Sequence, residues 1–281
     1  MTESTCDWEE RLSAWLPVWD AAGVPYVPAA ELGRAPVGEL AEAAINGKWS
    51  PRVVALMARV GGVPKGYMVR WDHGTGDYMK AFMDGGHLDN GAQRGIPQNL
   101  DDPLFYERCE DMIARRGEDF ELILWQRPWE QAVVVDGYPV EYRVFVLSGE
   151  VQGVSSYYPQ RPLPWECEWL TYAGDARRHT WKLLRHTKLR DFTADFLVSV
   201  DKEHEPERPG ARHQVVLLEC GPPHVSANFA GADPCCFCSG ETRGVVLAPQ
   251  PGSEAERANQ ARKERQPLWS TLLEPDGETD E

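Results

Sequence analysis

Apolar residues recur along this chain with two different spacings, and these spacings predict which segments are helices and which are strands. Between residues 8 and 22 they recur every three or four positions, which predicts an N-terminal helix with one buried face. A second helix is predicted over 51–59, because Ser50 can cap it, Pro51 suits its first turn and Gly61 can end it. Two further segments with helical character, the second rich in basic residues, cover 103–116 and 175–191.

The other apolar runs are short or alternate with polar residues, as is typical of β-strands. The first two cover 66–70 and 78–83 and flank the turn-rich segment 71–77, which predicts a hairpin with a long tip. Residues 85–102 are expected to form a loop. From residue 121 onward strands dominate, and turns rich in glycine separate them. The strands predicted in this part are 121–125, 131–135, 138–147, 150–158, 192–200 and 214–219.

Together these elements predict an α+β fold, and changes in composition along the chain predict its division. We expect an N-terminal helical or α+β region at 1–62 and a small subdomain with the hairpin at 63–120. A larger, strand-rich subdomain is expected at 121–248. Residues 249–281 are polar and acidic, which predicts a mobile tail.

Composition and charge restrict the possible partners. The 281 residues are 42% apolar, enough for a sizeable core, and carry a formal net charge of −15, which disfavours nucleic acid as a partner. A membrane-spanning run of roughly 18 apolar residues is not found, and the acidic N-terminus does not resemble a secretion signal. We therefore expect a cytoplasmic protein whose seven cysteines are reduced thiols.

Two carboxylates interrupt the last two apolar strands. Asp195 lies within 192–200 and Glu219 ends 214–219. Burying a carboxylate costs several kcal/mol unless a cation or strong hydrogen bonds compensate it, so two on adjacent strands suggest a divalent metal. Magnesium binds a few carboxylates together with substrate phosphates, which would imply a phosphate-bearing ligand. The alternative is structural: one ion pair with a core arginine and one residue at a sheet edge.

Two other segments carry charges in suggestive places. Strand alternation puts Glu141 and Arg143 on one face of their strand, where they either serve a ligand or form an exposed ion pair worth less than about 1 kcal/mol. In the hairpin, Arg70 and Lys80 flank the tip 73–76, whose sequence is His-Gly-Thr-Gly. Amides in such a tip can approach phosphates, although an ordinary turn would have the same composition.

In this order, the hairpin, the Glu141-Tyr142-Arg143 strand and the two late carboxylates resemble the ATP-grasp superfamily over roughly residues 66–219. The resemblance implies two α+β subdomains with ATP held between antiparallel sheets. Lys80-Ala81-Phe82 is similar to the Lys-x-Phe strand of a phage and bacterial clade, and the strand 122–128 resembles the linker that meets adenine. The nucleotide contacts implied by the resemblance are Arg70, Gly74, Gly76, Lys80, Gln126, Arg127, Glu141 and Arg143.

The resemblance also implies that Asp195 and Glu219 bind magnesium. The family usually ends this motif with Glu-x-Asn, whereas here Gly221 stands in place of the asparagine. The missing contact is either absent or supplied by another group, for which Asn228 and His224 are candidates. Within the resemblance, Gln126 also departs from the glutamate that many members have at that place.

Three functions follow from the resemblance. The first is an ATP- and magnesium-dependent ligase that activates a carboxylate as an acyl phosphate for attack by an amine, with Arg143 as the catalytic residue and a small molecule or peptide as substrate. The second is a non-catalytic ATP-binding assembly factor with a protein partner, because Arg143-Val144-Phe145-Val146 resembles a strand of the cell-division-cycle ATP-grasp proteins. The third is a nucleic-acid end-modifying ligase that would use the basic segment 175–191.

The run Cys235-Cys236-Phe237-Cys238 does not have the spacing of common zinc sites. We expect these cysteines to be buried or redox-sensitive thiols, with zinc binding as the alternative.

Overall fold

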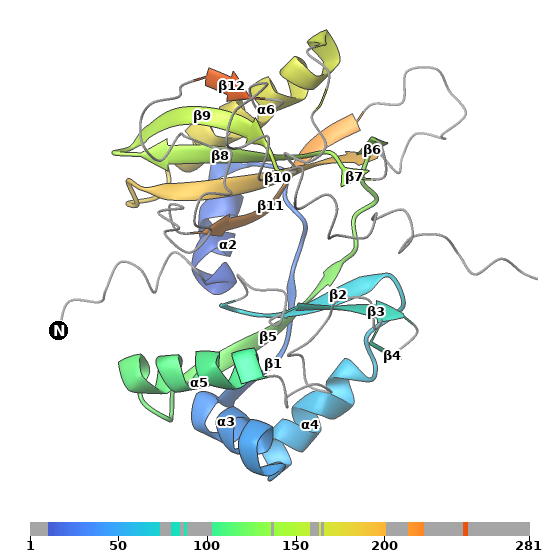
Figure 1. The fold of residues 1–281 in the computed structure, drawn as a ribbon, viewed down its shortest axis with the longest axis vertical. Helices are drawn as coiled ribbons and strands as arrows, with labels where there is room; N and C mark the ends of the chain where they lie inside the picture. The colour runs from blue at the N-terminus through green and yellow to red at the C-terminus, as the bar shows by residue number, and fades with distance from the viewer. Residues whose placement is uncertain are drawn as a thin grey trace, which may run out of the picture. The chain divides into compact units, whose positions relative to one another are not determined.

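The chain folds into two compact units, each with its own five-stranded sheet (Figure 1). The first unit comprises residues 1–13 and 27–130, and the second comprises residues 14–26 and 131–281. This computed structural model describes residues 11–73, 80–84, 87–88, 103–135, 138–157, 163, 166–200, 213–221 and 244–246.

The first unit is an antiparallel sheet with helices on one face (Figure 1). Its strands, in spatial order, are β1 (Ala30–Pro36), β5 (Glu121–Pro128), β2 (Tyr67–Trp71), β3 (Lys80–Asp84) and β4 (His87–Leu88). The helices are α3 (Val37–Asn46), α4 (Pro51–Val60) and α5 (Pro103–Arg116). Fully buried apolar side chains from the helices and the sheet form one core, which includes Leu40, Val53, Val69, Phe105 and Leu124.

Local sequence signals fix where helix α4 begins. Ser50 is its N-cap, and the Ser50 hydroxyl accepts a hydrogen bond from the Val53 amide at 3.2 Å. Pro51 occupies the first turn, where its missing N–H is not needed. The predicted helix is therefore confirmed, with the predicted cap.

The second unit is a mixed sheet with α2 (Leu12–Ala22) and α6 (Cys167–Leu183). Its strands, in spatial order, are β11 (His213–Gly221), β10 (Phe192–Val200), β8 (Glu141–Leu147), β9 (Glu150–Ser156) and β12 (Gly244–Val246). All neighbours are antiparallel except β12, which runs parallel to β9. A separate two-stranded ladder joins β6 (Val134–Val135) and β7 (Tyr138–Pro139).

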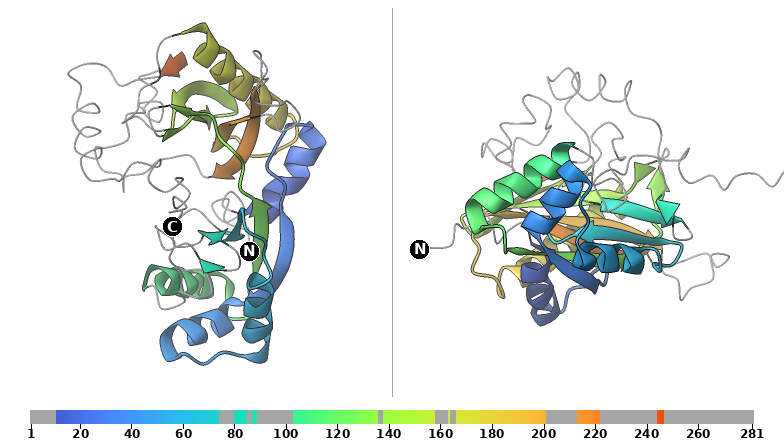
Figure 2. Two further views of the ribbon diagram at one scale, coloured as in Figure 1. Left: turned by 90° about the vertical axis from the view of Figure 1, so that its right-hand side faces the viewer. Right: turned by 90° about the horizontal axis from the view of Figure 1, so that it is seen from below.

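Both helices of the second unit pack on the same face of its sheet (Figure 2). The Trp15 ring of α2 lies 5.1 Å from the Phe192 ring, and the His179 ring of α6 stacks on Phe196 at 6.1 Å. Because alternate residues of a strand point to opposite faces, this packing leaves the odd-numbered positions of β8 and β10 on the other face. That other face carries the predicted polar residues Arg143, Asp195 and Glu219.

Several predicted elements match the structure closely. Helix α5 and strand β10 have the predicted bounds, and Trp15 and Trp19 are fully buried as expected of a core-facing helix stripe. None of the helices in the described part of the chain is long and apolar enough to cross a membrane.

Other elements differ from the prediction. Helix α6 covers Cys167–Leu183 instead of 175–191, because its buried face starts earlier, with Ala173 and Ala176, and ends at Leu183. Strand β1 and helix α3 were not predicted. Strand β5, expected to open the second subdomain, pairs with β1 and β2 in the first unit, so the observed division falls between residues 130 and 131.

Candidate functional site

Four polar residues form one row across the sheet of the second unit. Ser155 of β9 lies opposite Arg143 of β8, Arg143 lies opposite Asp195 of β10, and Asp195 lies opposite Glu219 of β11. Residues directly opposite each other in antiparallel strands lie on the same face, with their Cβ atoms roughly 5 Å apart. The structure thus brings together the predicted catalytic arginine and both predicted metal ligands.

A β-bulge brings Glu219 into this row. Asp195 pairs with Glu219, but the next residue, Phe196, pairs with Leu217. Leu218 is therefore an extra residue in β11. In a regular ladder, Leu218 would lie opposite Asp195 and Glu219 would point to the other face, because side chains alternate. Bulges commonly re-aim side chains beside functional sites, and this one turns Glu219 toward Asp195.

Arg143 and Asp195 form a buried, two-pronged ion pair. The guanidinium donates from Nε to Oδ1 and from Nη2 to Oδ2, both at 2.7 Å, with side-chain exposures of 15% for Arg143 and 7% for Asp195. Burial lowers the pKa of Arg143, but the Asp195 carboxylate outweighs it and holds the pKa well above its usual value. The interpretation of Arg143 as part of an exposed ion pair with Glu141 is wrong. An ion pair between Asp195 and a core arginine is present.

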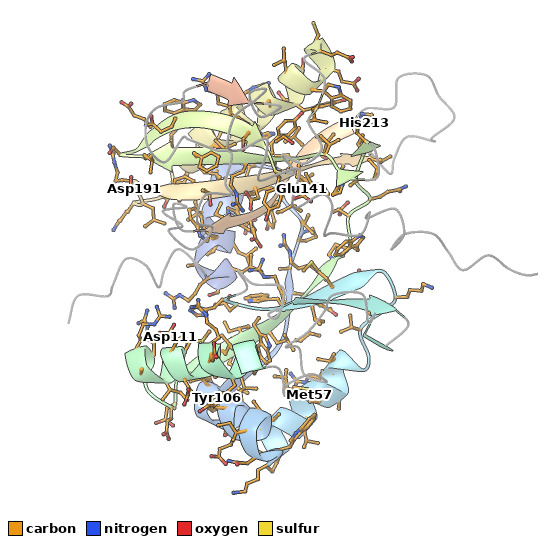
Figure 3. All side chains as sticks on the ribbon, in the orientation of Figure 1. Met57, Tyr106, Asp111, Glu141, Asp191 and His213 are labelled. Atoms are coloured by element: carbon orange, nitrogen blue, oxygen red, sulfur yellow. The ribbon has the colours of Figure 1, made fainter. Side chains whose placement is uncertain are left out.

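Tyr157, which no sequence pattern indicated, covers the arginine of this row. The Arg143 guanidinium lies 4.6 Å from the centre of the Tyr157 ring, a cation–π contact. The Tyr157 amide donates to the Glu141 carbonyl at 2.9 Å, which fixes the ring at the start of β8 (Figure 3 labels Glu141). Burial and the carboxylates of Asp195, Glu141 and Glu219 raise the pKa of Tyr157, against the effect of Arg143.

The site is rich in carboxylates. Three of them, from Glu141, Asp195 and Glu219, act on Tyr157 together with the single arginine of the row. Carboxylate oxygens are ligands that magnesium prefers, and a carboxylate that is paired with an arginine keeps free lone pairs for a second cation. The described residues hold no cluster of three or more histidine, cysteine or acidic side chains placed to bind a metal ion. Asp195 and Glu219 alone would not complete a metal site, so a magnesium ion at this row would need further oxygen ligands, such as those of a phosphate.

The predicted nucleotide contacts of the first unit lie on its central strands. Arg70 is 3% exposed on β2, and its Nε lies 3.4 Å from the Trp71 carbonyl oxygen. Lys80 pairs with Arg70 across the β2–β3 ladder, so the two backbones are neighbours. Gly74 and Gly76 lie outside the described residues.

Gln126 and Arg127 lie on β5, as predicted, but they differ in their surroundings. Gln126 pairs with Ala30 on one side and Val69 on the other. Arg127 is 2% exposed, and its Nη2 donates to the Val27 carbonyl at 2.7 Å. This bond fixes the Arg127 side chain within its own unit. Any contact of Arg127 with a nucleotide would therefore be made by its backbone and not by its side chain.

A buried carboxylate of the first unit was also not predicted. Asp72 is 3% exposed and accepts hydrogen bonds from the Ser13 amide at 2.7 Å, the Ser13 hydroxyl at 2.6 Å and the Trp125 indole at 2.8 Å. Asp72 is therefore a structural carboxylate that holds Ser13 and Trp125 of its own unit. Trp71 is fully buried, with its ring centre 5.9 Å from that of Phe105, and belongs to the core.

The described cysteines are free thiols, with Cys109 and Cys220 buried and Cys167 exposed. Burial raises the pKa of Cys109 to about 12, which keeps this thiol protonated. The run Cys235-Cys236-Phe237-Cys238 lies outside the described residues, as do Asn228 and His224.

Two units, each with a five-stranded and mainly antiparallel sheet and helices on one face, define the class: the chain has an α+β fold of the ATP-grasp type. No model of a known protein family matches the sequence, and no curated protein matches it either.

Among solved structures, Cdc123 from Schizosaccharomyces pombe is similar to this chain with a TM-score of 0.50 and 13% identity, over 84% of this chain and 94% of that chain. A C-terminally truncated form of the same protein gives a TM-score of 0.50, over 89% of this chain and 98% of that chain. N5-carboxyaminoimidazole synthetase from Staphylococcus aureus complexed with ADP matches at a TM-score of 0.38 and 13% identity, with 79% of this chain covering 47% of that chain. At these identities the likeness establishes the fold alone.

Proposed function

We propose that this chain binds ATP together with magnesium and uses it to activate a carboxylate as an acyl phosphate. The observation that carries the proposal is the row Arg143, Asp195 and Glu219, assembled from three strands by a bulge that turns Glu219 toward Asp195. A fold needs no such row for its stability, since a buried ion pair is seldom more stabilising than apolar residues of similar volume. A ligand that needs both a cation and metal-binding oxygens explains it.

The proposed roles follow from the chemistry of phosphoryl transfer. Asp195 and Glu219 would hold magnesium, which neutralises charge on the phosphate oxygens. Arg143, already fixed by Asp195 and Tyr157, is held ready to stabilise the charge that develops on the transferred phosphoryl group. Glu141 is assigned to the ribose. The remaining proposed nucleotide contacts, in the first unit, are Arg70, Gly74, Gly76, Lys80, Gln126 and Arg127.

The reaction would proceed in two steps. A carboxylate oxygen of the substrate attacks the γ-phosphorus of ATP, the bond to the β-phosphate oxygen breaks, and ADP leaves. An amine then attacks the acyl carbon, the bond to the phosphate oxygen breaks, and inorganic phosphate leaves. In both steps charge accumulates on oxygens that a fixed guanidinium can stabilise without reorganising.

Titration calorimetry with ATP and magnesium tests the site. Wild-type protein should bind ATP in a magnesium-dependent manner, and Glu219→Ala and Lys80→Ala should each weaken that binding. Glu168→Ala is the matched control, because its side chain is 51% exposed on α6 and lies outside the row. A well-folded wild type that does not bind ATP would overturn the proposal.

The second candidate is an ATP-binding factor without turnover, and Gly221 favours it, because the asparagine usual at that place is missing. Trapping with hydroxylamine separates the two candidates. An acyl phosphate formed from a candidate carboxylate gives a hydroxamate and ADP in equal amounts. Magnesium-dependent ATP binding with no hydroxamate from a broad set of acids, and a protein partner in pull-downs, would favour the factor.

The third candidate, a nucleic-acid end-modifying ligase, loses support from the bounds of α6. The basic residues expected on one helix face are split, since Arg185, Lys188 and Arg190 follow the end of the helix at Leu183. Arg178 also forms an exposed ion pair with Asp175. Salt-dependent binding of oligonucleotides would revive this candidate.

A further inference from the structure

The position of Gly221 points to the group that takes the place of the missing asparagine. Gly221 ends β11, two residues after Glu219, and therefore faces the same side of the sheet as the row. Its backbone is not among those of the described glycines with positive φ, so this position accepts a side chain without strain. The backbone conformation therefore does not require glycine at position 221.

Thr193 lies directly opposite Gly221 on β10. The Thr193 hydroxyl oxygen is 3.7 Å from the position that a Cβ atom on residue 221 would occupy, which is ordinary van der Waals contact. An asparagine side-chain oxygen lies roughly 2.4 Å from its own Cβ, so the hydroxyl borders the space that an amide at 221 would fill. Thr193 also lies two residues before Asp195 and on the same face of β10.

Thr193 lies in a closely packed, buried part of the sheet. The residue is 3% exposed, and its other cross-strand neighbour is Phe145, which is 2% exposed. A β-branched side chain has few χ1 rotamers, so its hydroxyl direction is well defined. Threonine hydroxyls bind magnesium in other nucleotide sites, where they complete a ligand set of one or two carboxylates and phosphate oxygens.

We propose that the Thr193 hydroxyl supplies the third protein oxygen of the magnesium site, beside Asp195 and Glu219, in place of a side chain at 221. This inference rests on the proposed function, because it presumes that magnesium binds at the row. It differs from a purely structural role for Thr193 in one respect: the effect of removing the hydroxyl depends on the metal.

Calorimetry with ATP, in magnesium and separately in EDTA, tests this inference on the full chain. Thr193→Val keeps the shape but removes the hydroxyl, and we expect it to weaken ATP binding in magnesium about tenfold, without effect in EDTA. Thr193→Ser should bind like the wild type. The double variant Thr193→Val/Gly221→Asn should recover affinity to within about threefold of the wild type, because the amide oxygen returns to the vacated space.

The outcomes separate the two proposals. If the wild type binds ATP in a magnesium-dependent manner and Thr193→Val binds equally well, the role of Thr193 is wrong and the proposed function stands. Equal losses in magnesium and in EDTA would assign Thr193 a structural role and also overturn the inference. If the wild type itself shows no magnesium-dependent binding, both proposals fail. Melting temperatures of all variants near that of the wild type establish that each is folded.

Discussion

Replacing Arg143 with methionine tests whether the ion pair at the centre of the row is as strongly coupled as its geometry indicates. Methionine keeps the length of the side chain and removes its charge. Two hydrogen bonds of 2.7 Å disappear, and the Asp195 carboxylate, only 7% exposed, is left without this cation. Breaking a buried pair from one side costs about 3–5 kcal/mol. Because Arg143 keeps 15% exposure, we expect a value near the lower end, about 3 kcal/mol.

Urea unfolding, followed by tryptophan fluorescence and circular dichroism, measures this cost. A loss of about 3 kcal/mol multiplies the unfolding equilibrium constant by roughly 150. Both probes must give the same transition, because a chain with two compact units can unfold in more than one step. Arg178→Met is the matched control, since its ion pair with Asp175 is exposed, and its cost should be below about 0.5 kcal/mol.

Excess magnesium adds a second comparison. If a metal binds at Asp195 and Glu219, it restores a cation beside the carboxylate, and the cost of Arg143→Met should fall. The structural reasoning would be refuted if Arg143→Met cost no more than the Arg178→Met control. An unchanged cost in magnesium would count against a metal at the row but not against the ion pair.

Three further predictions concern positions outside the row. Gly149→Ala should destabilise the protein by about 1–2 kcal/mol in urea unfolding, because Gly149 has φ of 75°. By contrast, Gly174→Ala, at an exposed position of helix α6, should be neutral or stabilising by up to about 1 kcal/mol. Burial lowers the pKa of His179 to about 4, so the stability of the folded protein should fall as the pH drops from 6.5 toward 4. The variant His179→Gln should show a smaller loss of stability over this range. An ordinary histidine pKa in an NMR titration would contradict this prediction. Trp125→Phe should cost about 1.5–3 kcal/mol, since Asp72 loses its indole donor, and a melting temperature equal to that of the wild type would contradict this role.

Local signals allowed much of the fold to be predicted from the sequence. Strand β10 is a mainly apolar segment whose residues are nearly all buried, and helix α4 carries a serine cap followed by proline, so both were predicted with close bounds. Strand β1 escaped prediction because it contains glycine and proline and has a register shift between Glu31 and Gly33. Its order comes from pairing with β5, about 90 residues later in the chain, and no local pattern records such a partner.

The candidate site divides in the same way. The residue types of the row stand out in the sequence because charges interrupt apolar strands. The identity of the ion-pair partner of Asp195 cannot be recognised in this way. Arg143 lies 52 residues earlier, and only the pairing of β8 with β10 brings the two residues together. Tyr157 and Thr193 went unnoticed for a related reason. A tyrosine at the end of a strand and a threonine within one are ordinary by sequence, and their significance depends on which residues lie opposite.

The bulge at Leu218 shows why sequence spacing alone could not establish the relation between the two carboxylates. Asp195 and Glu219 lie on consecutive strands of the pair β10–β11, and the number of residues between them does not determine whether they share a face. The extra residue in β11 determines which face Glu219 lies on, because it reverses the alternation of side chains for all later residues of that strand. The same residue therefore also determines that position 221 faces Thr193 rather than the helices on the other side. The position of Glu219 beside Asp195 and the proposed substitute for asparagine thus depend on one irregularity in the β10–β11 ladder, whereas the ion pair of Arg143 with Asp195 depends on the regular pairing of β8 with β10.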